Sequence, residues 1–321
     1  MSSTVTQSAP SARWRAILAF ALVYVMWGST FLGIRIVVEN IPPLMMGGVR
    51  FLISGALMLG WMKLRGAAIL LNRREMLRQT VIGFLLLTAS NVVMGYAERS
   101  VPSGLAALIS AIVPLWFLLL ERIADKRYRI APRGLAGIAI GVVGVITLLW
   151  PNLSSVGRLG LAGMLSSLLA LTASFNWALG SVVAKHWPSK ADPYTASGWQ
   201  MFNAGAINLA LSLAVGDLHR TVWAARSLWA IAYLVVAGSL VGYTAYVWLL
   251  RNIPTHKVAT YAYVNPIVAV FLGWLILGEK ITPLMVGGSA IVVVSVVLVT
   301  GARTPGAEPD DDAEPLESAG D

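Results

Sequence analysis

The chain has 321 residues, of which 57% are hydrophobic and 12% are charged, and its formal net charge is +9. Soluble domains average about 25% charged residues, so this composition argues against a water-soluble enzyme and favours a protein whose surface faces lipid. The absence of cysteine excludes disulfides, thiolate metal sites and cysteine nucleophiles. The three histidines are scattered and form no HExxH motif, so we expect neither a metal nor a cofactor.

The basic residues lie in short clusters between apolar runs and do not follow one polar face. This pattern argues against nucleic acid as a partner, because a nucleic-acid site needs a continuous basic surface. It is typical of the connections between membrane-spanning helices, where Lys and Arg set the topology. We therefore expect the lipid bilayer to be the partner of the apolar surface.

The apolar runs predict an all-α membrane protein. A helix needs about 20 apolar residues to cross the hydrocarbon core of a bilayer. Ten segments meet this requirement, and in chain order they are residues 16–38, 43–62, 77–97, 102–120, 133–150, 160–184, 194–215, 228–250, 256–277 and 282–301.

The distribution of Lys and Arg predicts the orientation. Most of these residues fall in connections on one side, including 63–78 and 122–133, so the positive-inside rule places both termini in the cytoplasm. Residues 1–15 then form a cytoplasmic N-terminal segment. Residues 302–321 are acidic and poor in apolar side chains, which predicts a disordered cytoplasmic tail.

An internal repeat is visible when the sequence is compared with itself. Trp27 and Trp177 are displaced by 150 positions, and Pro114 and Pro266 by 152. Each copy contains five predicted helices, an odd number, so the second copy must enter the membrane from the opposite face. We therefore expect two inverted five-helix repeats, at residues 16–150 and 160–301. Inverted repeats are typical of transporters, because two like units can exchange conformations around a midplane site.

Polar and aromatic residues gather in the first, third, fourth, sixth, eighth and ninth predicted helices. Such residues are costly in lipid unless they face a partner or water, so these helices should surround a cavity. Trp27 and Trp177 offer broad aromatic walls that attract an ammonium group, and Asn91 and Asn265 are the best polar contacts. The predicted substrate-binding residues are Trp27, Asn91, Asn176, Trp177, Tyr243, Tyr246, Tyr261 and Asn265.

Pro114 and Pro266 occupy corresponding positions in the fourth and ninth predicted helices. Each removes one intrahelical hydrogen bond and frees a carbonyl group. These kinks either serve packing alone or let the two halves bend reciprocally as gates.

Arg50 lies well inside the second predicted helix, and two interpretations stay open. A guanidinium can bind a substrate carboxylate through two hydrogen bonds. Alternatively, Arg50 pairs with Glu98 or with carbonyl groups and has a structural role. Arg35 lies near a helix end, from which its side chain can reach the interface.

The fifth predicted helix carries Gly134, Gly137, Gly141 and Gly144. Such a smooth strip lets another helix approach closely, either within one chain or across a homodimer formed by helices five and ten. The carboxylates Glu98 and Glu121 lie near opposite helix ends, so the spans show no clear titratable pair. Proton-coupled exchange and facilitated transport therefore both stay open.

Several short motifs resemble the EamA family of the drug/metabolite transporter superfamily, in the family's order and over residues 16–300. They are Met26-Trp27-Gly28-Ser29-Thr30-Phe31, Arg50-Phe51, Pro102-Ser103-Gly104 leading to Pro114, Tyr263-Val264-Asn265-Pro266, and Gly278-Glu279. This resemblance implies a ten-helix inverted-repeat carrier of the bacterial inner membrane. It also implies export of amino acids, including aromatic ones, or of related small metabolites.

Two other functions compete with amino-acid export. An exporter of toxic aromatic or cationic compounds would use the same aromatic walls. A membrane-embedded enzyme is the remote alternative, since the sequence shows no metal-ligand spacing, no Ser-His-Asp set and no close pair of intramembrane carboxylates. We therefore expect a transporter of a small molecule, and no enzyme.

Overall fold

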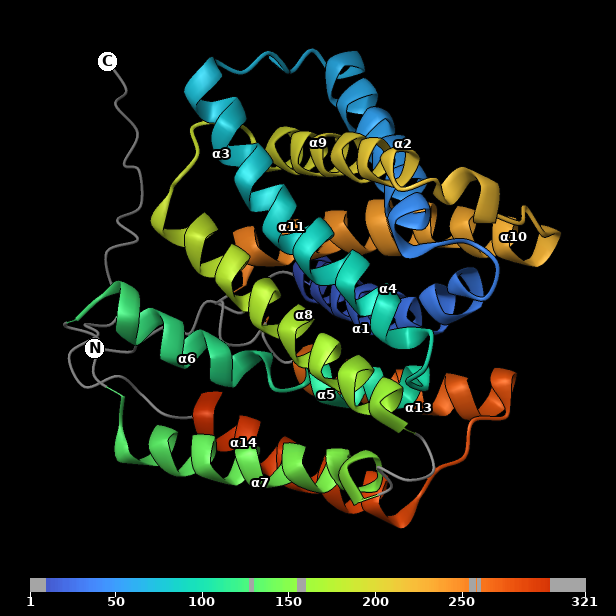
Figure 1. Ribbon diagram of the computed structural model, residues 1–321. Coiled ribbons are helices and arrows are strands. Elements are labelled where there is room, and N and C mark those ends of the chain that lie inside the picture. Colours follow the sequence, from blue (N-terminus) through green and yellow to red (C-terminus); the bar gives the residue numbers. More distant parts are fainter. Residues whose placement is uncertain (1–9, 127–129, 155–159, 254–257, 259–260, 301–321) are drawn as a thin grey trace, which may run out of the picture.

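The computed structural model describes residues 10–126, 130–154, 160–253, 258 and 261–300, and the regular elements in these ranges are helices (Figure 1). The predicted tail at 302–321 and most of the predicted N-terminal segment lie outside the described residues. The first half contains α1 (Pro10–Val38), α2 (Pro43–Leu64), α3 (Arg73–Gly83), η1 (Phe84–Val92), α4 (Val93–Glu98), α5 (Ser103–Ser110), α6 (Val113–Ala124) and α7 (Pro132–Ser154). The second half contains α8 (Gly160–His186), α9 (Pro193–Ala214), η2 (Asp217–Arg220), α10 (Ala225–Tyr233), η3 (Leu234–Val241), α11 (Gly242–Asn252), α13 (Tyr261–Leu277) and α14 (Pro283–Thr300).

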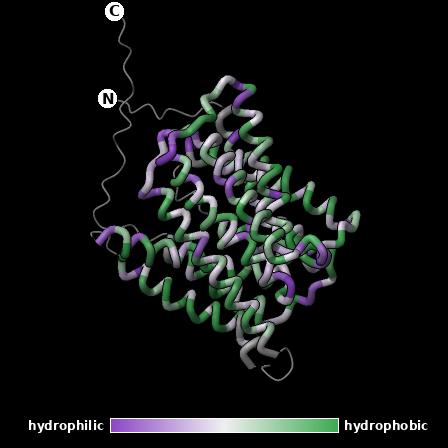
Figure 2. Tube along the Cα trace, turned by 45° about the horizontal axis from the view of Figure 1, so that its top comes forward, coloured by the Kyte–Doolittle hydropathy of each residue, from purple (hydrophilic) through white to green (hydrophobic). Residues whose placement is uncertain are grey.

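Among the described residues, 6 helices are long and apolar enough to cross a membrane, at Trp14–Val38, Pro43–Leu64, Arg73–Glu98, Ser103–Ala124, Ala162–His186 and Ala225–Leu249. Three shorter apolar helices follow the remaining predicted runs, at Pro132–Leu148, Val264–Leu277 and Pro283–Leu298. Figure 2 shows hydrophobic helix bodies, with hydrophilic residues gathered at connections and helix ends. Helix α9 falls in neither apolar group because Gln200, Asn203 and Asn208 lower its hydropathy.

Local sequence explains where the paired helices α2 and α9 begin and end. Pro43 and Pro193 each stand in the first turn, where the missing N–H costs no hydrogen bond. Gly66 and Gly216 follow the two helices with φ of 79° and 76°, a left-handed conformation that favours glycine. These glycines are themselves 150 positions apart, so the chain reversals belong to the repeat.

Equivalent helices of the two halves pack against each other. Helix α2 lies along α9, and α7 lies along α14 (Figure 1). A Cβ atom on Gly55 would lie 2.3 Å from the Phe202 backbone nitrogen, and one on Gly205 would lie 2.2 Å from that of Leu52. Glycine at both equivalent positions therefore permits a backbone contact that no other residue allows.

The glycine strip of the fifth predicted helix faces α14 of the same chain. A Cβ atom on Gly141 would lie 2.5 Å from Ser295 Oγ, and one on Gly144 would lie 2.8 Å from Val292 Cγ2. Ser295 Oγ donates to the Gly137 carbonyl oxygen at 2.7 Å. The glycine strip thus serves packing within one subunit. A dimer through α7 and α14 would have to use the faces of these helices that point away from each other.

Three of the predicted helices differ in detail from simple rods. The third and eighth each contain a wide π-helical segment, η1 and η3, between ordinary helical turns. The fourth is divided into α5 and α6 at Ala111 and Ile112. The fifth predicted helix, 133–150, is observed as α7 and continues past Pro151 to Ser154, so one proline is not sufficient to end this helix.

Candidate functional site

A cavity lies between the two halves. Its wall is built from α1, α2, η1, α4, α5, α6, α8, α9, η3, α11 and α13, and no described residue of α7 or α14 lines it. Among the predicted site residues it is lined by Trp27, Arg50, Asn91, Trp177, Tyr243, Tyr261, Asn265 and Pro266. Asn176, Tyr246 and Pro114 do not line this cavity.

Trp27 stands at the centre of an aromatic cluster. Its ring centroid lies 4.8 Å from that of Tyr246, 5.2 Å from Tyr261, 5.9 Å from Trp177 and 6.3 Å from Tyr243. Edge-to-face and tilted contacts of this kind stabilise a rigid arrangement of rings. Tyr246, which the sequence predicted as a binding residue, packs against the Trp27 ring.

The two π-helical segments form one side of the cavity in each half. A wide turn leaves carbonyl groups without their usual helical partners, and side chains from the opposite half occupy them. Asn176 Nδ2 donates to the Ala89 carbonyl oxygen of η1 at 3.1 Å. Trp27 Nε1 donates to the Gly238 carbonyl oxygen of η3 at 3.2 Å. Asn176 thus holds the wall in place, and the sequence offered no signal for either wide turn beyond polar residues in apolar runs.

Arg50 is 4% exposed and reaches the cavity from α2. Its Nε donates to Ser239 Oγ at 3.0 Å, and its guanidinium lies 4.8 Å from the Phe51 ring centroid. Nη1 has no hydrogen-bond partner. Among the described residues Arg50 forms no ion pair with Glu98, and its hydrogen bond to Ser239 joins α2 to η3. A structural role and a ligand-binding role for Arg50 therefore both stay open. A buried cation with a free donor is costly unless an anion approaches it.

The two asparagines that line the cavity are partly engaged by backbone. Asn91 Nδ2 donates to the Leu86 carbonyl oxygen at 3.3 Å, within the wide turn. With its amide nitrogen turned toward α1, Asn265 donates to the Tyr261 and Tyr24 carbonyl oxygens at 3.2 and 3.3 Å. The remaining acceptor oxygens can face a ligand.

The two repeated prolines have different surroundings. Pro114 stands in the first turn of α6, directly after the break that separates it from α5. Pro266 lies inside the described helix α13 and lines the cavity. The repeated proline therefore follows a helix break in the first half and lies inside a continuous helix in the second half.

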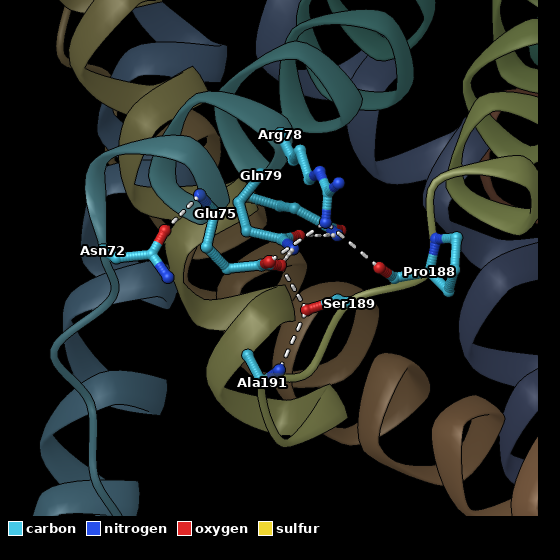
Figure 3. A network of polar contacts seen from close by, with 8 residues as sticks. Asn72, Glu75, Arg78, Gln79, Pro188, Ser189 and Ala191 are labelled. Carbon is cyan, nitrogen blue, oxygen red and sulfur yellow. Dashed lines mark hydrogen bonds and ion pairs between the residues drawn. The ribbon is translucent and has the colours of Figure 1, made fainter.

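A polar network that the sequence did not predict surrounds Glu75 at the start of α3 (Figure 3). Glu75 is 7% exposed and accepts hydrogen bonds from Gln79, Arg78 and Ser189. The sequence placed Glu75 in a connection, because its spacing from the apolar run gave no sign of burial. The network continues through Gln79 to Gln200 on α9.

Carboxylates also mark the two ends of the bundle. Glu279 accepts from the Ser103 and Gly104 backbone nitrogens at 2.7 and 3.0 Å and so caps α5. Glu121 binds Lys185 Nζ at 3.0 Å. Glu98 is fully buried with no partner for either carboxylate oxygen, and its backbone carbonyl accepts from Arg35. Arg35 therefore fixes a helix end, in addition to lying near the interface.

Comparison with known proteins bears on the whole chain. The sequence profile of the EamA-like transporter family matches residues 14–150 and again residues 164–301. The uncharacterized inner membrane transporter YedA of Escherichia coli K12 is 37% identical over 295 residues, which cover 90% of this chain and 92% of the relative.

More distant relatives carry a functional name. A probable amino-acid metabolite efflux pump of Escherichia coli K12 is 25% identical over 295 residues, covering 88% of this chain and 94% of the relative. A protein solved by crystallography superposes with a TM-score of 0.64 at 18% identity, covering 92% of this chain and 99% of that one. At this identity the likeness shows a shared fold.

Proposed function

The chain belongs to the EamA-like transporter family, and from that premise we propose that it exports amino acids or related small metabolites by alternating access. The family and its named relatives are transporters, which argues against an enzyme. The protein is a multi-pass inner-membrane transporter, as its relatives and its apolar helices show.

The observation that carries the proposed substrate class is Arg50. Arg50 lines the cavity together with the aromatic residues Trp27 and Trp177, and its Nη1 has no hydrogen-bond partner. A guanidinium that is removed from water binds a carboxylate strongly. A binding site for amino acids also needs a contact for the ammonium group and a space that accepts different side chains. The rings around Trp27 supply an apolar surface for the side chain. The name of the 25% identical relative agrees with this class.

The proposed mechanism requires ten membrane-spanning helices in two inverted repeats. The profile match occurs twice, and the pairs α2 with α9 and α7 with α14 join equivalent helices. Both termini then lie in the cytoplasm, as the distribution of Lys and Arg requires. Access would alternate when the two halves exchange conformations around the cavity.

The two prolines are the proposed gating points. One half is broken beside Pro114, whereas Pro266 lies within a helix of the other. Exchange of these two conformations between the halves would open the cavity to the opposite face. Ligand binding would then shift the population between the two states.

An exporter of cationic or aromatic toxic compounds is the second candidate. The aromatic cluster around Trp27 favours it, because ring faces attract cations. The buried positive charge of Arg50 opposes it, since a cationic ligand would approach a like charge in a medium of low dielectric constant.

Flux into proteoliposomes separates the two candidates. Purified protein would be tested with labelled amino acids, with cationic aromatic compounds as competitors, and with and without an imposed pH gradient. Amino-acid flux that competes poorly with cations would support the proposal, and dependence on the pH gradient would reveal proton coupling. Absence of all amino-acid flux, with transport of the cations, would overturn it.

The proposal allows a homodimer through the outer faces of α7 and α14. Leu135, Val143 and Val294 are exposed there, and the glycine face is already occupied within the chain. Mass measurement of the reconstituted protein in lipid nanodiscs would show whether two copies associate.

A further inference from the structure

A continuous chain of hydrogen bonds leads from Glu75 to the cavity wall. Gln79 Nε2 donates to Glu75 Oε1 at 2.8 Å, and Gln200 Nε2 donates to Gln79 Oε1 at 2.8 Å. The Tyr243 hydroxyl donates to Gln200 Oε1 at 3.1 Å. Glu75, Gln79 and Gln200 are 7%, 1% and 8% exposed, so water does not readily replace these partners.

The carboxylate at the start of this chain decides its direction. Ionised Glu75 can only accept hydrogen bonds, and Arg78 and Ser189 hold it in that form (Figure 3). Gln79 must therefore turn its amide nitrogen toward Glu75 and its oxygen toward Gln200. Gln200 must do the same in turn, which leaves only an oxygen for Tyr243. The Tyr243 hydroxyl must therefore donate its hydrogen to Gln200 Oε1.

The consequence appears at the cavity, which Tyr243 lines. A tyrosine hydroxyl has one hydrogen and two lone pairs, so Tyr243 offers the cavity an acceptor and no donor. The Ser197 hydroxyl donates to the Pro193 carbonyl oxygen at 2.6 Å, so its hydrogen is not available to Tyr243.

Hydrogen-bond donors lie on the same cavity wall. Ser239, which binds Arg50 Nε, precedes Tyr243 by four positions, and Arg50, Ser239 and Tyr243 all line the cavity. The wall thus carries a guanidinium with a free donor and a tyrosine whose hydroxyl can only accept.

We infer that Arg50 and Tyr243 form a subsite for the charged head group of an α-amino acid, and that Glu75 fixes its polarity from a distance. The carboxylate binds the free donor of Arg50, and the ammonium donates to the lone pairs of Tyr243. This inference rests on the proposed export of amino acids and adds what distinguishes them from simple carboxylic acids. Glu75, Gln79 and Gln200 are positioning residues.

Matched ligands test the inference. Calorimetric titration of purified full-length protein would compare phenylalanine with 3-phenylpropanoate, which lacks the ammonium group, and leucine with 4-methylpentanoate. We expect the wild-type protein to prefer each amino acid. In Glu75→Gln the chain can reverse and turn the Tyr243 hydrogen toward the cavity, so the ratio of the two affinities should fall about tenfold, as expected for one hydrogen bond to a charged group.

A second variant and a control separate polarity from general damage. Gln79→Met interrupts the chain of hydrogen bonds at similar side-chain volume and should lower the same affinity ratio. It therefore tests the inference if Glu75→Gln does not fold. Glu121→Gln alters another buried carboxylate, paired with Lys185 and outside the cavity, and should leave the ratio unchanged. The ratio does not depend on the fraction of folded protein.

The outcomes distinguish the two levels of the proposal. Wild-type preference for the amino acids that persists unchanged in a folded Glu75→Gln or Gln79→Met variant would overturn the inference and leave amino-acid export intact. Failure of the wild-type protein to bind either amino acid would overturn the proposed function and the inference together.

Discussion

The cavity wall and the α7–α14 pair are both formed by equivalent elements of the two halves, yet they differ in their polar groups. The wall leaves donors and acceptors open, as in Arg50 Nη1, and it contains the two wide helical turns. In the α7–α14 pair, the Ser295 hydroxyl is hydrogen-bonded to Gly137, and glycines lie against apolar side chains. A membrane protein keeps open polar groups only where a ligand or water meets them.

Substitutions should therefore have opposite signatures in the two regions. A change in the wall should alter transport per folded molecule, because the wall meets the ligand. A change between α7 and α14 should alter the yield and stability of the folded protein and leave specificity intact. The four experiments below test this contrast, starting with the largest expected effect.

Removal of the buried cation should have the largest effect on transport. Arg50→Leu deletes the proposed carboxylate contact, and hydrogen bonds to charged groups contribute about 1.5–3 kcal/mol, so amino-acid flux should fall roughly 10- to 100-fold. Flux per folded molecule would be measured in proteoliposomes. Arg50→Lys keeps the positive charge but loses the planar guanidinium, so its flux should lie between those of the wild-type protein and Arg50→Leu. Wild-type flux in folded Arg50→Leu would remove Arg50 from the site.

Filling the glycine contact should lower stability. Valine at position 141 places new atoms where Leu115 and Ser295 already lie, 2.2 and 2.5 Å from the Cβ position. Such overpacking costs about 1–3 kcal/mol, which thermal unfolding in detergent would detect. Gly287 on α14 has open space around it, so Gly287→Val is the matched control. Equal melting temperatures for the two variants would contradict the close packing described here.

Loss of one wall contact should have a smaller effect. Trp27→Phe keeps an aromatic ring but removes the hydrogen bond to Gly238, which is worth about 0.5–1.5 kcal/mol. We expect flux to fall roughly two- to tenfold with little loss of expression. Trp274→Phe alters a tryptophan that is 51% exposed and should change neither quantity. A folded Trp27→Phe protein with normal flux would separate this ring from substrate binding.

The prolines should give the smallest effect and the sharpest contrast between the halves. Pro266→Ala restores a backbone donor beside the cavity, whereas Pro114→Ala acts at an existing helix start. We expect Pro266→Ala to slow flux about threefold, from a change of less than 1 kcal/mol, with unchanged amino-acid affinity. Pro114→Ala should show a weaker slowing. A changed affinity would indicate that Pro266 shapes the binding surface and does not act in gating.

The helical runs could be predicted because spanning a bilayer demands a long apolar segment, which is a local property of composition. The span predicted at 43–62 is observed as the helix Pro43–Leu64, and the repeat offset of 150 is repeated in Gly66 and Gly216. The wide turn at Leu234–Val241 could not be predicted in this way. The Gly238 carbonyl group in this turn accepts a hydrogen bond from Trp27, which is 211 positions away in the sequence. Local helix propensity does not depend on such a distant partner.

The sequence by itself determined an all-helical membrane protein with an internal repeat, because length, hydropathy and self-similarity are properties of the linear sequence. Only the tertiary structure decided that Arg50 binds Ser239 and keeps a free donor, and that Glu75 is joined to Tyr243 through two glutamines. Hydrogen bonds are directional and short. Their pattern is fixed only when packing brings distant helices to within a few ångströms of one another.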